Sequence, residues 1–555
     1  MDWTRNFPLP VKTLALLACL MLFLFLRMPG ISLPYHQDEW KTAASADAGA
    51  EIAGSFFSHP PLTSALFRFD ASLFGADHMR ALPLLFGIFS FFLLFAVMRK
   101  RLGDRAAIFA VFLYAVSFGG IWSSLQLDTD GAILPAFFLL SLYCYDCFRE
   151  GWKWGWFAAL SLSLIVGFLV KLSFILVVGA LLLEFLVERG RSLSRKQLLG
   201  ALLSLTGFSV IAVLLLLGAH LAIPSFRLEA MIEHALQFFR FAGRNYTQII
   251  VEGVKVLYYL SPLLIAPLLL LSRETFRATR IFFVYLLAGL LFYFVLFDFS
   301  EGALDKYLLF MVIPLSAICG AILSRIVETY RSFEPAHVLI GAVLALGLFL
   351  LALVPASVMP LYPKAAWFGA ILGGQFNLLV PFQGGSGPIG FYISFLFIAA
   401  SFLFSFSVAL CALWKKSFRS AAIMLILLSG VAYNMVFAEE FSFGKLYGSA
   451  PAALAASLTF IEHTPAIESV LSFNDAGAWE LRKAGKYAGR FYAAPQFEEG
   501  HRHKFSTFTG HYLVVGIPPL YDGFYKQFFS SCDTLYLTRS GNIEARVYAC
   551  GQTKQ

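Results

Sequence analysis

The chain has 555 residues, of which 59% are hydrophobic and only 14% are charged. This is more apolar surface than a soluble fold of this length can bury, so the composition excludes a soluble globular protein and indicates one embedded in lipid. The formal net charge of +8 does not indicate a nucleic-acid partner, because the Lys and Arg residues are dispersed in short loops between apolar runs.

The apolar runs predict about thirteen transmembrane helices, because runs of roughly 20 residues cross ~30 Å of hydrocarbon as helices. The first run, Val11 to Leu26, is followed by no small-residue cleavage site, so we expect a retained helix. Only Lys171 separates the fifth and sixth spans, and one kinked helix there would invert everything after it. The predicted spans are 12–28, 80–98, 106–124, 131–148, 155–170, 172–187, 198–219, 256–271, 281–298, 307–323, 337–356, 390–413 and 420–437.

Lys and Arg are concentrated in alternate, short connections such as Arg99-Lys100-Arg101 and Lys415-Lys416. The positive-inside rule therefore predicts a multi-pass protein with its N-terminus in the cytoplasm and its C-terminus outside. We expect the chemistry on the outer face, where the long loops lie. The third outer loop contains Gly373-Gly374 and a glycine-rich stretch at 384–388, which predict a mobile or tightly turned segment. The long outer loops are 29–79, 220–255 and 357–389.

After about residue 438 the apolar runs shorten, which predicts a membrane domain at 1–438 and a small extracytoplasmic α/β domain at 439–555. A helical stretch is expected at Ala476–Lys486 and a hairpin turn at Ser540-Gly541-Asn542. In an oxidising compartment Cys532 and Cys550 could pair as a disulfide, although sequence does not give their separation. The predicted strands are Ser469–Phe473, Tyr512–Gly516, Thr534–Leu537 and Ala545–Tyr548.

The sharpest polar feature is Asp38-Glu39, a carboxylate pair just past the first span on the outer face. Carboxylates near lipid are costly and tend to mark function. An aspartate is ionised at neutral pH and can act as a general base toward an acceptor hydroxyl. The alternative is that Asp38 caps the alanine-rich helix that follows, and the two roles are compatible.

A second acidic motif, Asp128-Thr129-Asp130, lies in the short outer loop between the third and fourth spans. Capping of the fourth span is the alternative, and it fits Asp130 better than Asp128. Lys171 and Lys306 lie at the same predicted outer boundary, where they could hold a lipid-linked phosphate or simply extend to the headgroups. His59, before two prolines, is either a phosphate donor or a surface residue.

No cluster of His, Cys and carboxylates has the spacing of metal ligands, so the sequence indicates no certain cofactor. A divalent cation at Asp38, Glu39 or Asp128 is left open. The expected partners are membrane lipids and substrates that lipids carry, and no nucleic acid.

Taken in order, these motifs resemble the C-type (GT-C) membrane glycosyltransferases, in particular the branch of protein O-mannosyltransferases and bacterial aminoarabinose transferases. The resemblance covers nearly the whole chain, from the acidic motif of the first outer loop to the outer C-terminal domain. Histidine stands at position 59 where the family has lysine, which weakens a phosphate-binding role there because neutral imidazole carries no fixed charge. The matching residues are Asp38-Glu39, His59-Pro60-Pro61, Asp128 with Asp130 as a rival, Lys171, and Lys306-Tyr307 followed by Pro314.

The resemblance implies sugar transfer from a polyprenyl-phosphate donor to a cell-envelope acceptor outside the cytoplasmic membrane. Asp38 would be the base, and Lys171, Lys306 and His59 would receive the leaving phosphate. The loop 357–389 would be a lid over the donor. The sugar, the acceptor and the anomeric outcome stay open.

Two other functions make different demands on the sequence. A lipid or glycolipid transporter would place ionisable residues at mid-membrane depth and show paired halves with broken helices. A polyprenyl-linked glycan polymerase or ligase would favour a large outer loop rich in arginine. Here the charges gather at the predicted outer edge and no paired halves are seen, which disfavours the transporter, and the polymerase or ligase stays the nearer alternative.

Overall fold

In the computed structural model the chain forms two compact units. Unit 1 is Met1–Ile31, Lys41–Gly341 and Ser405–Val431, and unit 2 is Ser32–Trp40, Ala342–Phe404 and Ala432–Gln555. The predicted boundary at residue 438 stays a prediction. The glycine-rich stretch 384–388 lies outside the described residues, which are 9–48, 59–190, 195–223, 226–237, 239, 243–298, 305–329, 335–382 and 389–550.

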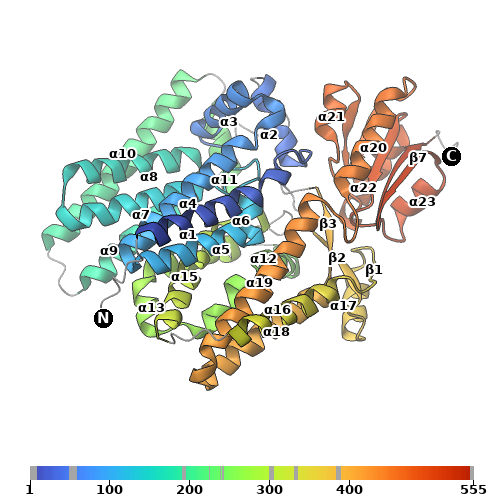
Figure 1. Ribbon diagram of the computed structural model, residues 1–555. Helices are drawn as coiled ribbons and strands as arrows, with labels where there is room; N and C mark the ends of the chain where they lie inside the picture. The colour runs from blue at the N-terminus through green and yellow to red at the C-terminus, as the bar shows by residue number, and fades with distance from the viewer. Residues whose placement is uncertain are drawn as a thin grey trace. The chain divides into compact units, whose positions relative to one another are not determined.

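Unit 1 is helical in its described residues, and its helices pack along one another (Figure 1). Helix α5 packs against α1, α4 and α15, and α7 packs against α4 and α8. The helices up to residue 329 are α1 Leu9–Phe25, α2 Asp38–Ala48, α3 Pro61–Phe74, α4 Ala81–Leu102, α5 Asp104–Val116, α6 Phe118–Ser123, α7 Ile133–Gly151, α8 Trp154–Val170, α9 Ile175–Arg189, α10 Arg195–Ala222, α11 Leu228–Leu236, α12 Tyr246–Ile265, α13 Arg273–Ala278, α14 Arg280–Leu291 and α15 Val312–Thr329.

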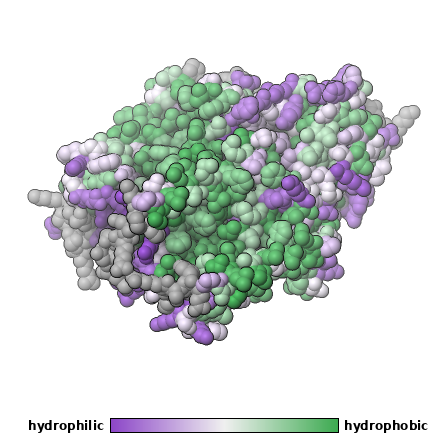
Figure 2. All heavy atoms as spheres, in the orientation of Figure 1, coloured by the Kyte–Doolittle hydropathy of each residue, from purple (hydrophilic) through white to green (hydrophobic). Residues whose placement is uncertain are grey.

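Among the described residues, 8 helices are long and apolar enough to cross a membrane, and two shorter apolar helices accompany them. Apolar side chains cover much of the visible surface (Figure 2), which a protein in water could not sustain. The protein is therefore a polytopic membrane protein, as predicted. The long spans are Pro10–Gly30, Ala81–Leu102, Leu202–Ala222, Tyr246–Leu270, Asp305–Thr329, Pro335–Ala352, Phe395–Trp414 and Lys416–Ser442, and the short ones are Trp154–Val170 and Arg280–Leu296.

The fifth and sixth predicted spans are two separate helices, α8 and α9. Lys171 between them has extended backbone (φ −155°, ψ 135°), which ends α8. Arg149, at the end of α7 and just before α8 begins, pairs with Glu188 at the end of α9. The end of α9 thus lies near the start of α8, so the chain reverses at Lys171. The reversal is tight, because a Cβ on Gly167 would lie 2.4 Å from the Phe174 ring.

The third predicted outer loop is more ordered in unit 2 than its glycines suggested. Strand β1 (Ser357–Val358) pairs in parallel with β2 (Leu378–Phe382), which pairs antiparallel with β3 (Phe391–Ser394). Gly373 follows helix α17 (Lys364–Leu372), and Gly374 turns with a φ of 82°. Of the two expectations for this loop, a mobile or a tightly turned segment, the tight turn is confirmed at Gly374. The long helices of residues 335–442 are α16 Pro335–Ala352, α18 Phe395–Trp414 and α19 Arg419–Ser442.

The C-terminal part of unit 2 contains the predicted α/β fold. Its five-stranded sheet has the order β5-β4-β6-β8-β7, with β4 parallel to both neighbours and β8 antiparallel to β6 and β7. The predicted turn at Gly541 joins β7 to β8 with a φ of 56°. The elements are α20 Ala450–His463, β4 Val470–Phe473, α21 Ala478–Lys483, β5 Tyr487–Phe491, α22 Glu498–Thr507, β6 His511–Val515, α23 Phe524–Ser530, β7 Asp533–Ser540 and β8 Ile543–Ala549.

The core of this sheet is aromatic. Phe491, Tyr512 and Tyr525 are fully buried in it, and a disulfide joins Cys532 to Cys550 beside it. Strand β5 was not predicted, because Ala488, Gly489 and Arg490 interrupt the alternation of large apolar side chains that marks a half-buried strand.

Candidate functional site

Two lysines and two aspartates of the predicted site meet at one end of the unit 1 helices. Lys306 lies 3.2 Å from Asp128, and Lys171 donates to the carboxylate of Asp130. The four residues come from the start of the α15 span, the α6–α7 connection and the α8–α9 reversal. We call this end of the helices the site end.

The aspartates do not cap the helix that follows them. Helix α7 begins at Ile133, and its N-cap residue, Ala132, makes no side-chain capping bond. Asp128 instead accepts the backbone N–H of Thr129 at 2.5 Å and faces Lys306. The capping alternative for Asp130 is therefore wrong, and the carboxylates serve the charge cluster.

The ring of Tyr307 brings the two lysines together. The Nζ atoms of Lys171 and Lys306 each lie 4.8 Å from its centroid, within the range of cation–π attraction. Both ammonium groups are therefore directed toward one small region. The structure thus juxtaposes residues that are far apart in the sequence.

Two histidines border this cluster. His59 precedes Pro60 and helix α3, whose Thr63 hydroxyl donates to the carbonyl of Val170 beside Lys171. The His59 ring lies 5.8 Å from the ring of His234 on α11. Sequence reasoning missed His234; the only signal was a histidine on a short amphipathic helix in the second of the predicted outer loops.

The cluster sets the charge states of its members. Burial would raise the pKa of the Asp128 carboxyl, but Lys306, Lys171 and His59 together hold that pKa far below its usual range. Burial raises the pKa of Asp130 despite the opposing Lys171. Burial opposes the charge of Lys171, yet Asp130 and Asp128 raise its pKa.

Burial and the cluster lower the pKa of both histidines. Burial and the Lys171 ammonium lower the pKa of His59 to about 3. Burial, Lys171 and Lys306 also lower the pKa of His234. Both imidazoles are therefore neutral at neutral pH.

The predicted base and its neighbour, Asp38 and Glu39, lie in unit 2 at the start of α2. Glu39 is buried, and its carboxylate accepts the backbone N–H of His36 at 3.3 Å, so it fixes the turn into the helix. Asp38 is partly exposed and is the first helical residue, after Gln37 with a left-handed φ of 46°. Such backbone strain in a non-glycine residue often accompanies function.

The segment around Asp38 is held against the C-terminal sheet. Within unit 2, the Tyr35 ring lies 6.1 Å from Trp479, and Trp40 meets Tyr487 edge-on at 5.1 Å. Burial contributes most to the raised pKa of Tyr492, and the Asp38 carboxylate adds to it. Asp38 is therefore close to the part of the sheet where β5 ends.

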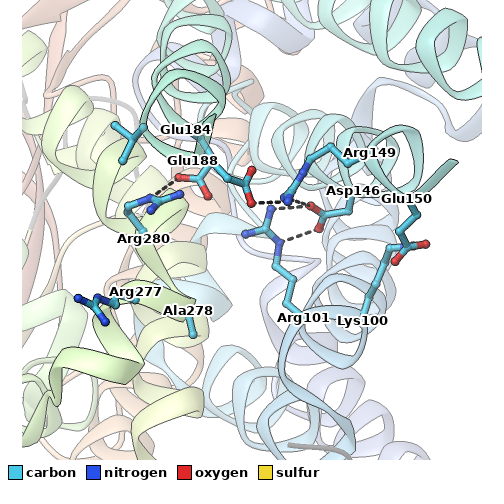
Figure 3. A pocket seen from close by; sticks show the side chains of 11 residues that line it. Lys100, Arg101, Asp146, Arg149, Glu150, Glu184, Glu188, Arg277, Ala278 and Arg280 are labelled. Atoms are coloured by element: carbon cyan, nitrogen blue, oxygen red, sulfur yellow. Dashed lines mark hydrogen bonds and ion pairs between the residues drawn. The ribbon is translucent and has the colours of Figure 1, made fainter. Parts of the chain in front are cut away.

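A cavity of about 440 Å³ lies at the opposite end of the unit 1 helices. Arg101 binds Asp146 through two contacts of 2.6 Å, and Arg280 binds Glu184 at 2.8 Å (Figure 3). Arg277 points away from these pairs. We call this end the basic end. Its pairs tie α4, α7, α9 and α14 together, and it contains none of the predicted site residues.

The described residues contain no group of three or more His, Cys, Asp or Glu side chains arranged to hold a metal ion. The carboxylates of the cluster, Asp128 and Asp130, are engaged by the two lysines.

A solved structure shares this fold. ArnT from Cupriavidus metallidurans matches in its apo state and bound to undecaprenyl phosphate, each with a TM-score of 0.55 and 14% identity over 96% of this chain and 97% of that one. The oligosaccharyltransferase of Archaeoglobus fulgidus is a weaker match, with a TM-score of 0.43 and 13% identity over 91% of this chain and 69% of that one. No curated protein matches by sequence.

The chain therefore has the fold of ArnT, in agreement with the resemblance to the GT-C membrane glycosyltransferases. More particularly, residues 58–215 match the family model of the dolichyl-phosphate-mannose-protein mannosyltransferases. That range contains His59, Asp128, Asp130 and Lys171 of the cluster, and Lys306 lies outside it.

Proposed function

We propose that the chain transfers a sugar from a polyprenyl-phosphate donor to a cell-envelope acceptor at the outer face of a bacterial cytoplasmic membrane. The observation that carries the proposal is the convergence of Lys171, Lys306 and Tyr307 at the site end. The undecaprenyl phosphate bound by ArnT, which shares the fold, supports a lipid phosphate as the ligand.

The two lysines are suited to stabilising the phosphate as it leaves the sugar. An ammonium group has three donors, so Lys171 and Lys306 can each keep a carboxylate and still donate to a phosphate oxygen. Asp128 and Asp130 then act as positioning residues, which hold the ammonium groups charged and directed. Such preorganised positive charge stabilises a leaving anion without any reorganisation during the reaction.

The catalytic step requires one further group, a base for the acceptor. We assign this role to Asp38, the partly exposed carboxylate of the first loop. Asp38 takes the proton of the acceptor hydroxyl, and the oxygen forms a bond to the anomeric carbon. The bond from that carbon to the phosphate oxygen breaks, and the polyprenyl phosphate leaves with the electron pair toward the lysines. A single displacement of this kind inverts the anomeric centre.

A divalent cation is not required by this arrangement, since two lysines supply the positive charge. Glu39 is turned to the backbone of His36, and Asp128 is engaged by Lys306, so the described contacts offer neither as a ready metal ligand. Activity that persists in a chelator would agree with this assignment.

The test is a transfer assay on purified protein with a panel of polyprenyl-phosphate sugars and membrane extract as acceptor. Native protein is expected to label the extract, and Asp38→Asn is expected to lose transfer by about 10³-fold while binding donor normally. Asp47→Asn is the matched control, because Asp47 is an exposed carboxylate near the other end of the same helix. This control should transfer at the native rate. Native-rate transfer by folded Asp38→Asn would contradict the base assignment.

A further inference from the structure

The C-terminal sheet has a place where ligands commonly bind. Strand β4 lies between β5 and β6 and is parallel to both, and the connection leaving β4 runs toward β5 whereas the connection leaving β6 runs toward β7 on the other side of the sheet. In parallel sheets, ligands bind beyond the carboxyl ends of the strands where this order reverses. Here that edge is formed by the residues after Phe473, Phe491 and Val515.

The backbone at this edge is strained. Asn474 and Asp475 follow β4 with left-handed φ values of 53° and 62°, which non-glycine residues rarely adopt in succession. The strain places the Asp475 side chain in the interior, fully buried, where it accepts the Tyr487 hydroxyl. Strain of this kind persists where a surrounding structure holds a functional arrangement.

Asp475 in turn orients Arg490. The guanidinium donates through Nη1 to the carboxylate at 3.0 Å and lies 5.0 Å from the Tyr492 ring centroid. The Arg490 side chain is still 40% exposed, and no further hydrogen bond of its guanidinium occurs among the described residues. A fixed fork of N–H donors is thus presented at the surface.

Aromatic rings extend this face. Tyr492 and Phe497 have centroids 5.5 Å apart, and Phe497 is 40% exposed. Trp40, two residues after Asp38, meets Tyr487 of β5 edge-on at 5.1 Å, and the Asp38 carboxylate contributes to the raised pKa of Tyr492. The proposed base, an oriented guanidinium and an open aromatic surface therefore belong to one face of unit 2.

The charges of this face disfavour an anion. Arg490 and Lys504, whose Nζ donates to the Arg490 carbonyl at 2.8 Å, are balanced by Asp475 and Asp38. A face without net charge has no excess attraction for a phosphate, and Asp38 would repel one. Exposed rings with oriented donors suit a neutral, hydroxyl-rich ring, whose C–H surface packs on the aromatics.

We propose that Arg490, Tyr492 and Phe497 form the acceptor-binding site and hold an uncharged saccharide with one hydroxyl directed at Asp38. This inference rests on the proposed function for the role of Asp38. It assigns acceptor recognition to the C-terminal sheet, and donor phosphate binding to unit 1.

The experiment measures binding of neutral oligosaccharides of glucose, galactose, mannose and N-acetylglucosamine to the full chain in detergent, by saturation-transfer NMR without donor. Phosphorylated forms of the same sugars are the second arm. Neutral sugars are expected to bind, and Tyr492→Ala and Phe497→Ala to weaken the binding about tenfold. Arg490→Lys, which keeps the charge but loses the fork, is expected to do the same.

Arg539→Ala is the matched control, because this exposed arginine lies on β7 at the far edge of the same sheet. It should bind sugars as native protein does. In the transfer assay, the face variants Arg490→Lys, Tyr492→Ala and Phe497→Ala should raise the KM for the acceptor. The KM for the donor should stay unchanged.

Binding of phosphorylated sugars alone, or equal binding by native protein and the three face variants, would overturn the proposal. Failure of the proposed function gives a different result. In that case native protein would neither bind a polyprenyl-phosphate sugar nor transfer it, whatever the saccharide arm shows.

Discussion

The two ends of the unit 1 helices both carry ion pairs, but they differ in how most of their cations are held. At the basic end, arginines bind aspartate and glutamate with their planar forks, as in the two contacts of Arg101 with Asp146. At the site end, the cations are lysines, beside a tyrosine ring and two histidines. At the basic end each of these guanidinium groups is fixed by a carboxylate of a neighbouring helix, whereas at the site end two ammonium groups meet at one ring and keep N–H donors for a ligand. The comparison separates a cluster that fastens helices from one that can bind phosphate.

The largest expected effect is the loss of transfer when a site-end lysine is removed. Lys306→Met should lower the transfer rate about 10²- to 10³-fold, because the leaving phosphate loses a preorganised positive charge. Since this change leaves Asp128 unpaired, the double variant Lys306→Met/Asp128→Asn is the control for folding. A double variant that is folded and active would show that the charge is not needed.

At the basic end, we expect a substitution to lower the stability of the protein and to leave its transfer activity unchanged. Arg101→Met leaves the buried Asp146 without its main partner and should lower the free energy of unfolding by about 3 kcal/mol. A thermal shift assay checks the expected drop in Tm, and transfer per folded molecule should be native. A loss of donor binding in this variant would remove the distinction between the two ends.

The histidines predict a pH dependence of donor binding. The pKa of His59 is about 3 without ligand because of burial and Lys171, and a bound phosphodiester adds negative charge that raises it. A group whose pKa rises on binding takes up a proton, so affinity should increase severalfold as the pH falls from about 6 to about 4.

His59→Gln should flatten this dependence, and His234→Gln should do so to a similar extent, since burial, Lys171 and Lys306 also lower the pKa of His234. Binding of a non-titrating polyprenyl-phosphate sugar by native protein over this pH range is the measurement. Donor affinity that is constant with pH, or that falls on acidification, would exclude proton uptake at these histidines.

The smallest effect concerns the ring between the lysines. Tyr307→Phe keeps the aromatic face and should change donor affinity less than about threefold, whereas Tyr307→Leu should weaken it about fivefold through lost cation–π attraction. Equal affinities for the two variants would mean that the ring only fills space.

Sequence predicted the fold class, because apolar length is a local signal, but thirteen spans were predicted where the described residues have 8 long spans and two shorter apolar helices. It could not decide the chain reversal at Lys171, which depends on the close approach of Phe174 to Gly167. Strand β5 lacked alternation, and the order of residues 357–382 depends on pairing with distant strands.

The candidate site was predictable as a set of residues but not as a geometry. Asp130 has the sequence position of a helix cap, and only the fold reveals that it pairs with Lys171. His234 could not be singled out, since a histidine on a loop helix gains meaning only from the neighbours that the fold supplies. The face around Arg490 was not predicted at all, because Arg490 lies on a strand that the sequence did not reveal.

The most direct measurement of the central claim is binding of a polyprenyl phosphate to two charge-neutral double variants, one from each end. Lys171→Met/Asp130→Asn removes a pair at the site end, and Arg101→Met/Asp146→Asn removes one at the basic end. We predict that the first loses lipid-phosphate binding at least about tenfold and that the second binds as native protein does. Native affinity in the site-end variant, with the protein folded, would contradict the claim.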